Sequence, residues 1–412
     1  MFSIQYSDSA SGLNTENGIL NTQSPGSRPI RPSARTLNST ANAHDPALAL
    51  FAKCVVAATF ALIFIGGLVT SYNAGMAVPD WPLSFGTLNP EGWWGDLPVR
   101  LEHGHRLFAA GLGLLVTILC AWVWRNGWPL LIALGGAGAL TPGAKVAGLP
   151  PSVIMHVGIW SFAGIFALAL LWMAKGRVPT TSRMVRALVF AAFVGVCLQA
   201  TFGGLRVTLE TANQLRAALI LRIVHGCVAQ AELCLLVAVA TLLSRSWLEG
   251  SWKLPGVRLP AIRLLAWLSV AAVYGQLILG ATLRHLGAGL AIPTFPEADP
   301  NGGFLPDQRS LVVDLHFSHS RIGALALTLL IFTLSLTVLR GARGERRMTG
   351  PATGLLGLLF VQLSLGMAVI LHLKPITLTT FHVVNGAAVL ALSLLLALRA
   401  SRFTDQQTEV PA

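Results

Sequence analysis

Long apolar runs, separated by short polar segments, fill the chain from about residue 50 onward. A helix needs about 20 predominantly apolar residues to cross a bilayer. Runs of that length lie near residues 51–71, 105–124, 153–174, 185–205, 221–243, 262–283, 318–339, 352–373 and 379–399. A shorter, glycine-rich run covers 128–140. The pattern predicts an all-α polytopic membrane protein with about ten membrane segments.

Basic residues between these runs gather on one side of the predicted membrane. They are Arg125, Lys175, Arg177, Arg183, Arg186, Arg245, Lys253, Arg258, Arg263, Arg340, Arg343, Arg346 and Arg347. The positive-inside rule makes this side cytoplasmic, and Lys53 and Arg399 then place both termini there. An even number of crossings follows, so we expect 128–140 to span or re-enter the membrane as the partner of 153–174.

Composition supports a membrane location. Hydrophobic residues make up 54% of the 412 residues and charged residues only 11%, whereas soluble domains carry roughly 25% charged residues. The net charge of +12 is explained by the cytoplasmic loops, and no nucleic-acid partner is expected. The five cysteines all fall inside apolar runs, where we expect small buried side chains.

The ends of the chain differ from this pattern. Residues 1–46 are rich in Ser, Asn, Thr, Pro and Gly, which predicts a disordered cytoplasmic tail. No apolar core of a secretory signal lies near the start. Acidic residues such as Asp8 and Glu16 are unusual in a mitochondrial transit peptide, so a bacterial inner membrane is favoured. Residues 401–412 are expected to form a second cytoplasmic tail.

The two halves of the chain repeat one another. The segment GMAVPDWP, from Gly75, matches GLAIPTFP, from Gly289. We call the difference in residue number between these matching positions the repeat offset. The segment QATFGGLRV, from Gln199, likewise matches QLSLGMAVI, from Gln362. We therefore predict two tandem four-helix units, 47–250 and 251–400. A helical hairpin at about 126–182 is inserted in the first unit, and its two crossings preserve the direction of the chain.

Four histidines occupy repeated positions near the non-cytoplasmic starts of apolar helices: His105, His225, His319 and His382. Ionisable groups in membrane segments are costly and usually functional, and imidazole is a common axial ligand of haem iron. A lone histidine is more often a hydrogen-bonded core residue, but the repetition favours ligands. We predict one bis-His haem site per bundle, near the extracytoplasmic face. For His285, at an outer helix end, a polar interfacial role is expected.

Glu102 lies three residues before His105, so the two share a helix face. A carboxylate beside a haem can bind water, move a proton or stabilise a cation. The alternative is an interfacial ion pair with Arg106. The matching residues of the second half are His316 and Ser320, and this asymmetry suggests that only one site performs chemistry.

Several arginines are expected near the same outer face: Arg206, Arg222, Arg284 and Arg321. A guanidinium can bind a carboxylate through two hydrogen bonds, which makes haem propionates candidate partners. The alternative is a side chain that snorkels to the membrane interface.

These motifs together resemble the heme A synthase family. The resemblance rests on Glu102-x-x-His105-Arg106, the GGLVT helix end from Gly66, the QATFGGLRV segment and LRIVHG around His225. It covers roughly residues 50–125 and 183–400. It implies a tandem pair of four-helix bundles that oxidises the C8 methyl of haem O to the formyl group of haem A. Two successive hydroxylations would give a geminal diol, which loses water.

The resemblance also implies roles for particular residues. His105 and His225 would flank the substrate haem O, and His319 and His382 would ligate a haem b used in electron transfer. Glu102 would be the catalytic acid. Cofactor-binding roles are expected for Arg106, Arg206 and Arg321. Expected partners are a haem O synthase, oxidase assembly factors and a second copy of the chain.

The sequence departs from the family pattern at three points. The inserted hairpin adds two crossings, and the outer loops lack the cysteine pair of some members. Arg321 follows His319 by two residues, whereas Arg106 follows His105 by one. A rival interpretation is a diheme cytochrome that only carries electrons. A transporter is disfavoured, because transporter repeats are often inverted whereas four-span repeats recur in parallel.

Overall fold

The computed structural model describes residues 44–124, 147–148, 153, 164, 181–249, 252–254, 259–299 and 301–405. Within these ranges, eight helical segments are long and apolar enough to cross a membrane. They are α2 (Pro46–Ser71), α3 (Leu97–Val123), α6 (Arg183–Thr211), α7 (Leu215–Leu242), α9 (Leu259–His285), the continuous segment α10 (Leu311–Phe317), η2 (Ser318–Gly323) and α11 (Ala324–Gly341), then α12 (Arg346–Leu371) and α13 (Ile376–Arg402). The prediction of an all-α polytopic membrane protein is confirmed.

Some predicted features lie outside the described residues. These are the short run 128–140, the span 153–174 apart from two isolated positions, the hairpin at 126–182, nearly all of the tail 1–46, and the end of the tail 401–412. The division into units 47–250 and 251–400 stays a prediction.

Five helices begin more than one turn before their predicted starts near residues 51, 105, 221, 318 and 352. At α3 the side chain of Asp96 accepts a hydrogen bond from the Val99 N–H (3.0 Å), and Pro98 occupies the first turn. An acidic cap followed by proline is a strong helix start. The polar residues of the next turns interrupt the apolar run, so hydropathy alone starts the helix too late. His105 consequently lies in the third turn of α3.

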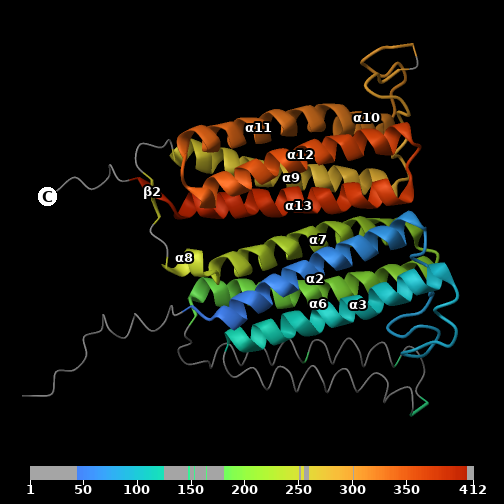
Figure 1. Cartoon of the computed structure of the whole chain (residues 1–412). Coiled ribbons are helices and arrows are strands. Elements are labelled where there is room, and N and C mark those ends of the chain that lie inside the picture. The colour runs from blue at the N-terminus through green and yellow to red at the C-terminus, as the bar shows by residue number, and fades with distance from the viewer. Residues whose placement is uncertain are drawn as a thin grey trace, which may run out of the picture. The chain divides into compact units, whose positions relative to one another are not determined.

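The spanning helices form two groups (Figure 1). Helices α2, α3, α6 and α7 pack together, and α9, α10–α11, α12 and α13 pack together. The groups meet where α2 and α7 contact α13 and where α7 contacts α9. One close approach lies at Gly67 of α2, where a Cβ would stand 3.0 Å from Cγ2 of Thr380 on α13. In the described part of the chain, the helices of each group follow one another in sequence.

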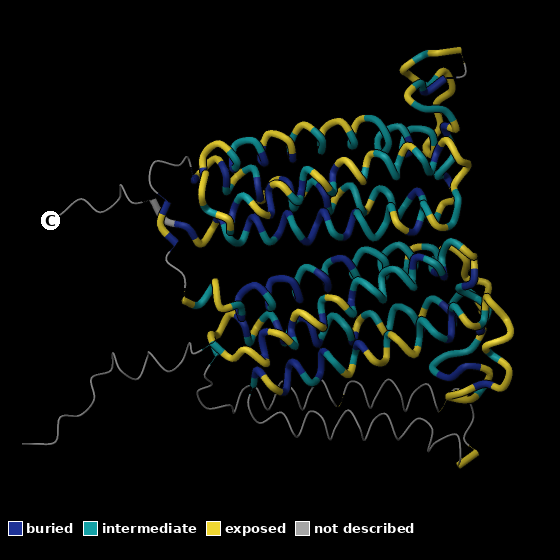
Figure 2. The backbone as a smooth tube through the Cα atoms, in the orientation of Figure 1, coloured by how far each residue is buried: buried dark blue, intermediate teal, exposed yellow. Residues whose placement is uncertain are grey.

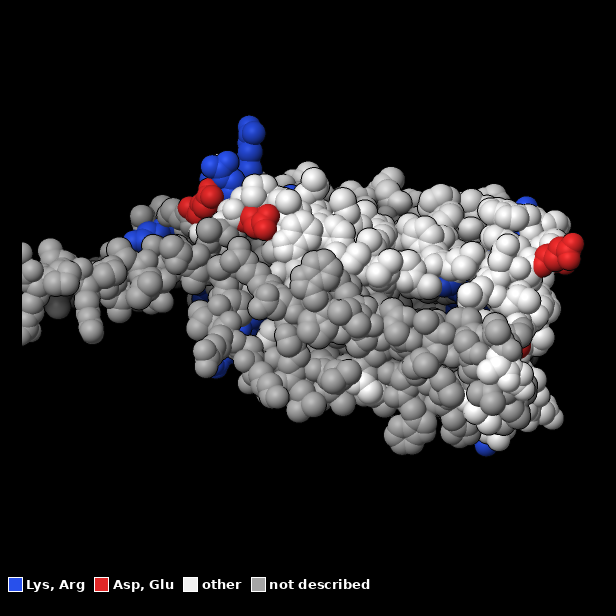
Figure 3. All heavy atoms as spheres, turned by 90° about the horizontal axis from the view of Figure 1, so that it is seen from below, with Lys and Arg blue, Asp and Glu red and all other residues white. Residues whose placement is uncertain are grey.

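Each group has an apolar core. Leu119, Val189 and Phe193 are among the fully buried residues of the first core, and Ile331 and Leu390 of the second. Figure 2 shows buried residues in the helices of both groups. Large apolar side chains elsewhere remain exposed, and the described atoms in Figure 3 are mostly uncharged, with charged side chains mainly toward the ends of the helices. Such an extensive exposed apolar surface is suited to lipid.

The start of α2 and the end of α13 lie at one end of the helices (Figure 1). A short parallel pairing of β1 (Lys253–Leu254) with β2 (Thr404–Asp405) lies there, beside α8 (Arg245–Glu249). Glu345, which precedes α12, accepts a hydrogen bond from the Arg347 guanidinium (2.7 Å), and this contact holds the pKa of its carboxyl below the usual value. The opposite end carries the loops 72–96 and 286–310.

Candidate functional site

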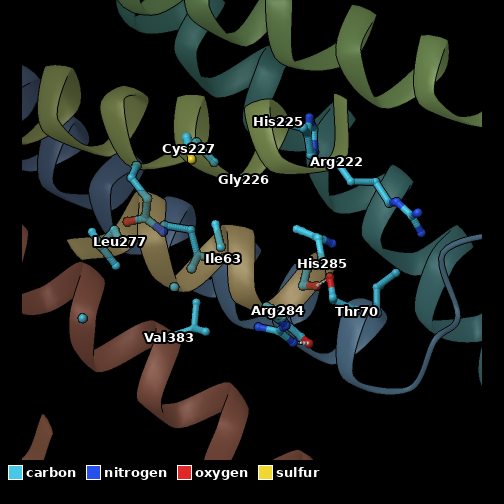
Figure 4. Close-up of a pocket in the computed structure, with 18 of the residues that line it drawn as sticks. Ile63, Thr70, Arg222, His225, Gly226, Cys227, Leu277, Arg284, His285 and Val383 are labelled. Carbon is cyan, nitrogen blue, oxygen red and sulfur yellow. Dashed lines mark hydrogen bonds between the residues drawn. The ribbon is translucent and has the colours of Figure 1, made fainter. Parts of the chain in front are cut away.

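A cavity of about 1980 Å³ lies among the helices and is lined by residues of both groups. All four repeated histidines contribute to its wall. Figure 4 shows one part of it, where Arg222 and His225 come from α7, Arg284 and His285 from α9, and Thr70 from α2. His285, expected at the membrane interface, thus lies in the cavity wall.

His105 of α3 and His225 of α7 form the first pair. The ring of His105 lies against Gly66 of α2, where a Cβ would stand 3.1 Å from Cε1 of the imidazole. The ring of His225 lies against Gly203 of α6, where a Cβ would stand 3.5 Å from Cε1 of that imidazole. Nδ1 of both rings is buried and has no hydrogen-bond partner among the described residues. Both side chains are therefore held in place while their nitrogens remain available to a ligand.

His319 of η2 and His382 of α13 form the second pair. Their ring centroids are 6.4 Å apart and their planes meet at 76°. His319 lies against Gly280 and His382 against Gly366, where a Cβ would stand 2.9 and 3.1 Å from the Cε1 atoms. The Nε2 of Gln362 lies 3.3 and 3.2 Å from the two ring nitrogens of His382. A side chain larger than hydrogen at either glycine would displace the imidazole.

The second pair fits the axial positions of a haem. An imidazole nitrogen bonds a first-row transition metal at about 2 Å and lies about 1 Å from its ring centre, so two rings on one ion have centres about 6 Å apart. Within the described part of the chain, no three His, Cys, Asp or Glu side chains form a metal-ion cluster. Two histidines alone suit an ion that arrives with its own equatorial ligands, as haem iron does.

Glu102 is 3% exposed and firmly bound. Its Oε2 accepts a hydrogen bond from the Val78 N–H (2.9 Å), and its Oε1 accepts one from Nη2 of Arg106 (2.8 Å). Nη2 of Arg206 lies 3.6 Å from the same Oε1. The ion pair with Arg106 considered above is formed. Glu102 nevertheless lines the cavity together with His105.

His316 makes the equivalent hydrogen bond to a loop in the second half of the chain. Its Nδ1 accepts a hydrogen bond from the Ile292 N–H (2.9 Å). Ile292 and His316 are the partners of Val78 and Glu102 under the repeat offset. A neutral acceptor is therefore sufficient to hold this loop, and the negative charge of Glu102 has no counterpart there.

Arg106 and Arg321 hold equivalent loops despite their different spacing from the histidines. Arg106 donates to the carbonyls of Asp80 (2.6 Å) and Leu83 (3.2 Å). Arg321 donates to the carbonyls of Thr294 (2.6 Å) and Glu297 (2.8 Å). The two pairs of carbonyls match one another under the repeat offset.

The π-helical turn η2 accounts for that spacing difference. A π-turn accommodates one more residue than an α-turn, and η2 contains both His319 and Arg321. The extra residue is absorbed within the helix, so both side chains keep their places. A propionate-binding role for Arg106 or Arg321 stays a prediction.

Other cations reach the cavity between the two groups of helices. Arg222 lies 3.7 Å from Glu210, and Arg206 donates to the carbonyl of Gly75. Arg284 of α9 donates to the Gly67 carbonyl (2.7 Å) and to Oγ of Ser71 (2.6 Å) on α2. Within the described ranges, Arg284 forms no ion pair with a carboxylate.

Sequence reasoning assigned no contact with the histidines to Gly66, Gly280 or Gln276. Gly66 and Gly280 are related by the repeat offset, as His105 and His319 are, so a search for glycines that follow the same offset would have found them. Gln276 donates to the His319 carbonyl (2.6 Å). No sequence signal distinguishes that contact from any other glutamine in an apolar helix.

These two bundles of membrane helices, each with a pair of imidazoles at an internal cavity, define a polytopic membrane protein with paired candidate ligands. Residues 156–394 match the COX15-CtaA family, described as cytochrome oxidase assembly protein, and the chain belongs to that family.

Relatives of the chain bear the name heme A synthase. The protein of Bradyrhizobium sp. strain BTAi1 is 27% identical over 365 residues, which cover 84% of this chain and 90% of that protein. That of Bradyrhizobium sp. strain ORS 278 is 26% identical over the same length. The Brucella ovis protein is 34% identical over 85 residues, 18% of this chain and 24% of that protein.

Proposed function

We propose that this protein is a heme A synthase, an oxidoreductase that converts the C8 methyl group of haem O to the formyl group of haem A. The observation that carries the proposal is the pairing of His319 with His382. Their ring centroids are 6.4 Å apart, and each ring lies against a glycine. Family membership and the names of the relatives support the choice of reaction.

In this proposal the two histidine pairs have different ligands. His105 and His225 hold the substrate haem O, and His319 and His382 hold a haem b. When bound, haem b supplies a one-electron redox centre. The residues around it orient the rings: Gln276 bonds the His319 backbone, and Gln362 contacts the His382 imidazole. The apolar helices exclude bulk water from both sites.

Glu102 is the proposed acid–base group. Oxidation of a methyl to a formyl group consumes one water and releases four protons and four electrons. Glu102 is a carboxylate in the wall of the first site, and it can accept a proton from that water. The electrons leave to a one-electron acceptor. Nη2 of Arg106 and Nη2 of Arg206 lie 2.8 and 3.6 Å from Oε1 of Glu102.

We assign the haem propionates to the cations of the cavity. Arg206, Arg222 and Arg284 line it, and Arg284 forms no ion pair within the described ranges. Arg106 and Arg321 contribute mainly through the loops that they hold. A carboxylate bound between guanidinium groups gains charge-assisted hydrogen bonds.

We also propose an orientation. The basic loops support a cytoplasmic location for the start of α2 and the end of α13, and these ends lie together (Figure 1). The histidines lie toward the other ends of their helices, which supports sites near the extracytoplasmic face. The two helix groups then correspond to the tandem units of a bacterial inner-membrane protein.

A diheme electron carrier is the second candidate. It is favoured by one observation: Glu102 makes the same loop contact as His316, so its presence does not by itself require chemistry. Haem extraction separates the two functions. Cells that express this chain with a haem O source should yield haem A or hydroxylated haem O. Unchanged haem O, in cells where both haems bind the purified protein, would reject the synthase and leave the carrier.

A further inference from the structure

Glu232 of α7 is an acid that the proposed reaction does not yet use. It is 4% exposed, and both carboxyl oxygens are buried without a hydrogen-bond partner among the described residues. It appears in none of the ion pairs formed in the described ranges. Buried side-chain oxygens are normally hydrogen-bonded, so this group requires a functional explanation.

The carboxyl group faces the same cavity as the first histidine pair. Glu232 follows His225 by seven residues, which is two helical turns on the same face and about 10 Å along the axis. Both residues line the cavity. The carboxyl lies directly against Gly195 of α6, where an added Cβ would collide with Oε2. Helix α6 thus leaves space for this side chain, as α2 and α6 leave space for the two imidazoles.

The second bundle has no equivalent acid. His382 of α13 corresponds to His225 of α7 in the repeat, and the same correspondence carries Glu232 onto Val389, a buried apolar residue of α13. The acid therefore accompanies only the site that we assign to the substrate. This asymmetry, unlike that of Glu102 and His316, is not explained by a shared contact with a loop.

Other titratable groups line the cavity from α7 and the helices packed on it. They are Cys197, Arg206 and Glu210 of α6, Arg222 and Cys227 of α7, Tyr274, Arg284 and His285 of α9, and His382 of α13. Helix α2 brings none to the wall. Thiols, phenols and guanidinium groups ordinarily titrate above neutral pH, and Glu210 is paired with Arg222. Besides the ligands, Glu232, His285 and Glu102 of α3, which lines the same cavity, are the groups to separate by experiment.

An unpaired carboxylate charge in the membrane interior costs several kcal/mol. That cost falls when a positive charge appears nearby, because opposite charges in a low-dielectric interior attract strongly. An iron held by His105 and His225 would add one positive charge to the site when it gives up an electron. The ionised form of the carboxyl is therefore favoured in the oxidised state and the protonated form in the reduced state.

We propose, on the basis of the proposed function, that Glu232 is the redox-linked proton carrier of the first haem site. When the site gives one electron to a one-electron acceptor, the Glu232 carboxyl releases one proton to cavity water. When the site gains an electron, the carboxylate takes a proton back. The net charge of the bundle interior then stays constant through each electron transfer.

The test is a spectroelectrochemical titration of the purified holoprotein over a range of pH. The first haem is the signal that His225→Ala removes. Its midpoint potential should fall with rising pH by up to about 59 mV per pH unit, a tenfold shift in the redox equilibrium. Glu232→Gln keeps the shape of the side chain and should abolish most of this slope. The second haem serves as an internal control, because Val389 stands at its matching position.

A second measurement tests directly whether the Glu232 carboxyl changes its protonation state. The oxidised-minus-reduced infrared difference spectrum should contain a carboxyl band that Glu232→Gln removes. A slope that survives in Glu232→Gln, or that His285→Gln removes instead, overturns the proposal. The absence of any slope in the unmodified protein also overturns it. These results differ from a failure of the proposed function, in which His225→Ala and His319→Ala would leave the haem content unchanged.

Discussion

Gly66 of α2 lies against the imidazole of His105, with room for a hydrogen atom but not for a methyl group without displacement. The same relationship joins Gly280 to His319, where a Cβ would approach Cε1 to 2.9 Å. A glycine facing each ligand lets two helices approach closely. It also fixes where the imidazole ring can stand, so the position of the ring depends on the neighbouring helix.

This relationship gives a first prediction. Gly280→Val should displace the His319 ring and reduce bis-His haem in the second site by at least tenfold, because its methyl groups would occupy the place of the imidazole. Absorbance and paramagnetic resonance of the purified protein measure the loss. Gly275→Ala is the matched control, since nothing lies within 4 Å of a Cβ at that glycine of the same helix. Normal haem content in Gly280→Val would contradict the seating of the ring.

The second pair of histidines provides a direct test of ligation. His319→Ala and His382→Ala should each remove the low-spin haem b spectrum, because a single axial imidazole leaves the iron with an open position. His372→Ala, at an exposed position after α12, should leave the spectrum intact. Retention of the bis-His signal in both pocket variants would show that other residues ligate the iron.

The structural role of Glu102 can be separated from its chemical role by substitution. Glu102→His reproduces the acceptor that His316 supplies in the second half, so the loop contact to the Val78 N–H should be kept. The carboxylate is lost, and haem A formation should fall about 100-fold or more, the range of a missing general acid–base group. Haem extraction should reveal haem O or a hydroxylated form. Normal haem A output would remove Glu102 from the chemistry.

Arg321 should stabilise the loop 286–310. Arg321→Ala removes charge-assisted hydrogen bonds to the Thr294 and Glu297 carbonyls, which should cost about 3 kcal/mol of local stability. Hydrogen exchange of the loop should accelerate accordingly. Arg309→Ala is the control, because its ion pair with Asp314 is largely exposed and such pairs contribute little. Equal exchange rates in the two variants would contradict this role.

The sequence predicted the membrane helices and the repeated histidines because both depend on strong, periodic signals. Apolar runs of spanning length identify helices, and the repeat offset aligns His105 with His319. The helix starts were predicted too late, because hydropathy ignores caps such as Asp96. The expected spans at 128–140 and 153–174 fall outside the described residues.

The finer features of the site depend on tertiary contacts that sequence periodicity does not contain. Arg321 follows His319 by two residues, whereas Arg106 follows His105 by one. Only the structure shows that a π-turn accommodates the additional residue. The loop contact of Glu102 requires knowledge of where Val78 lies, 24 residues earlier. Glu232 has no motif around it, and only its burial without a partner distinguishes it.

Adjacent glycines of α2 face different neighbours. Gly66 contacts the His105 ring of one bundle, while Gly67 approaches Thr380 of α13 and gives its carbonyl to Arg284 of α9. Helix α2 therefore contacts residues of both bundles. A ligand that shifted this helix on entering the first bundle would also move the contacts on which the second bundle rests, so the order in which the two pockets are filled would influence how readily each is filled.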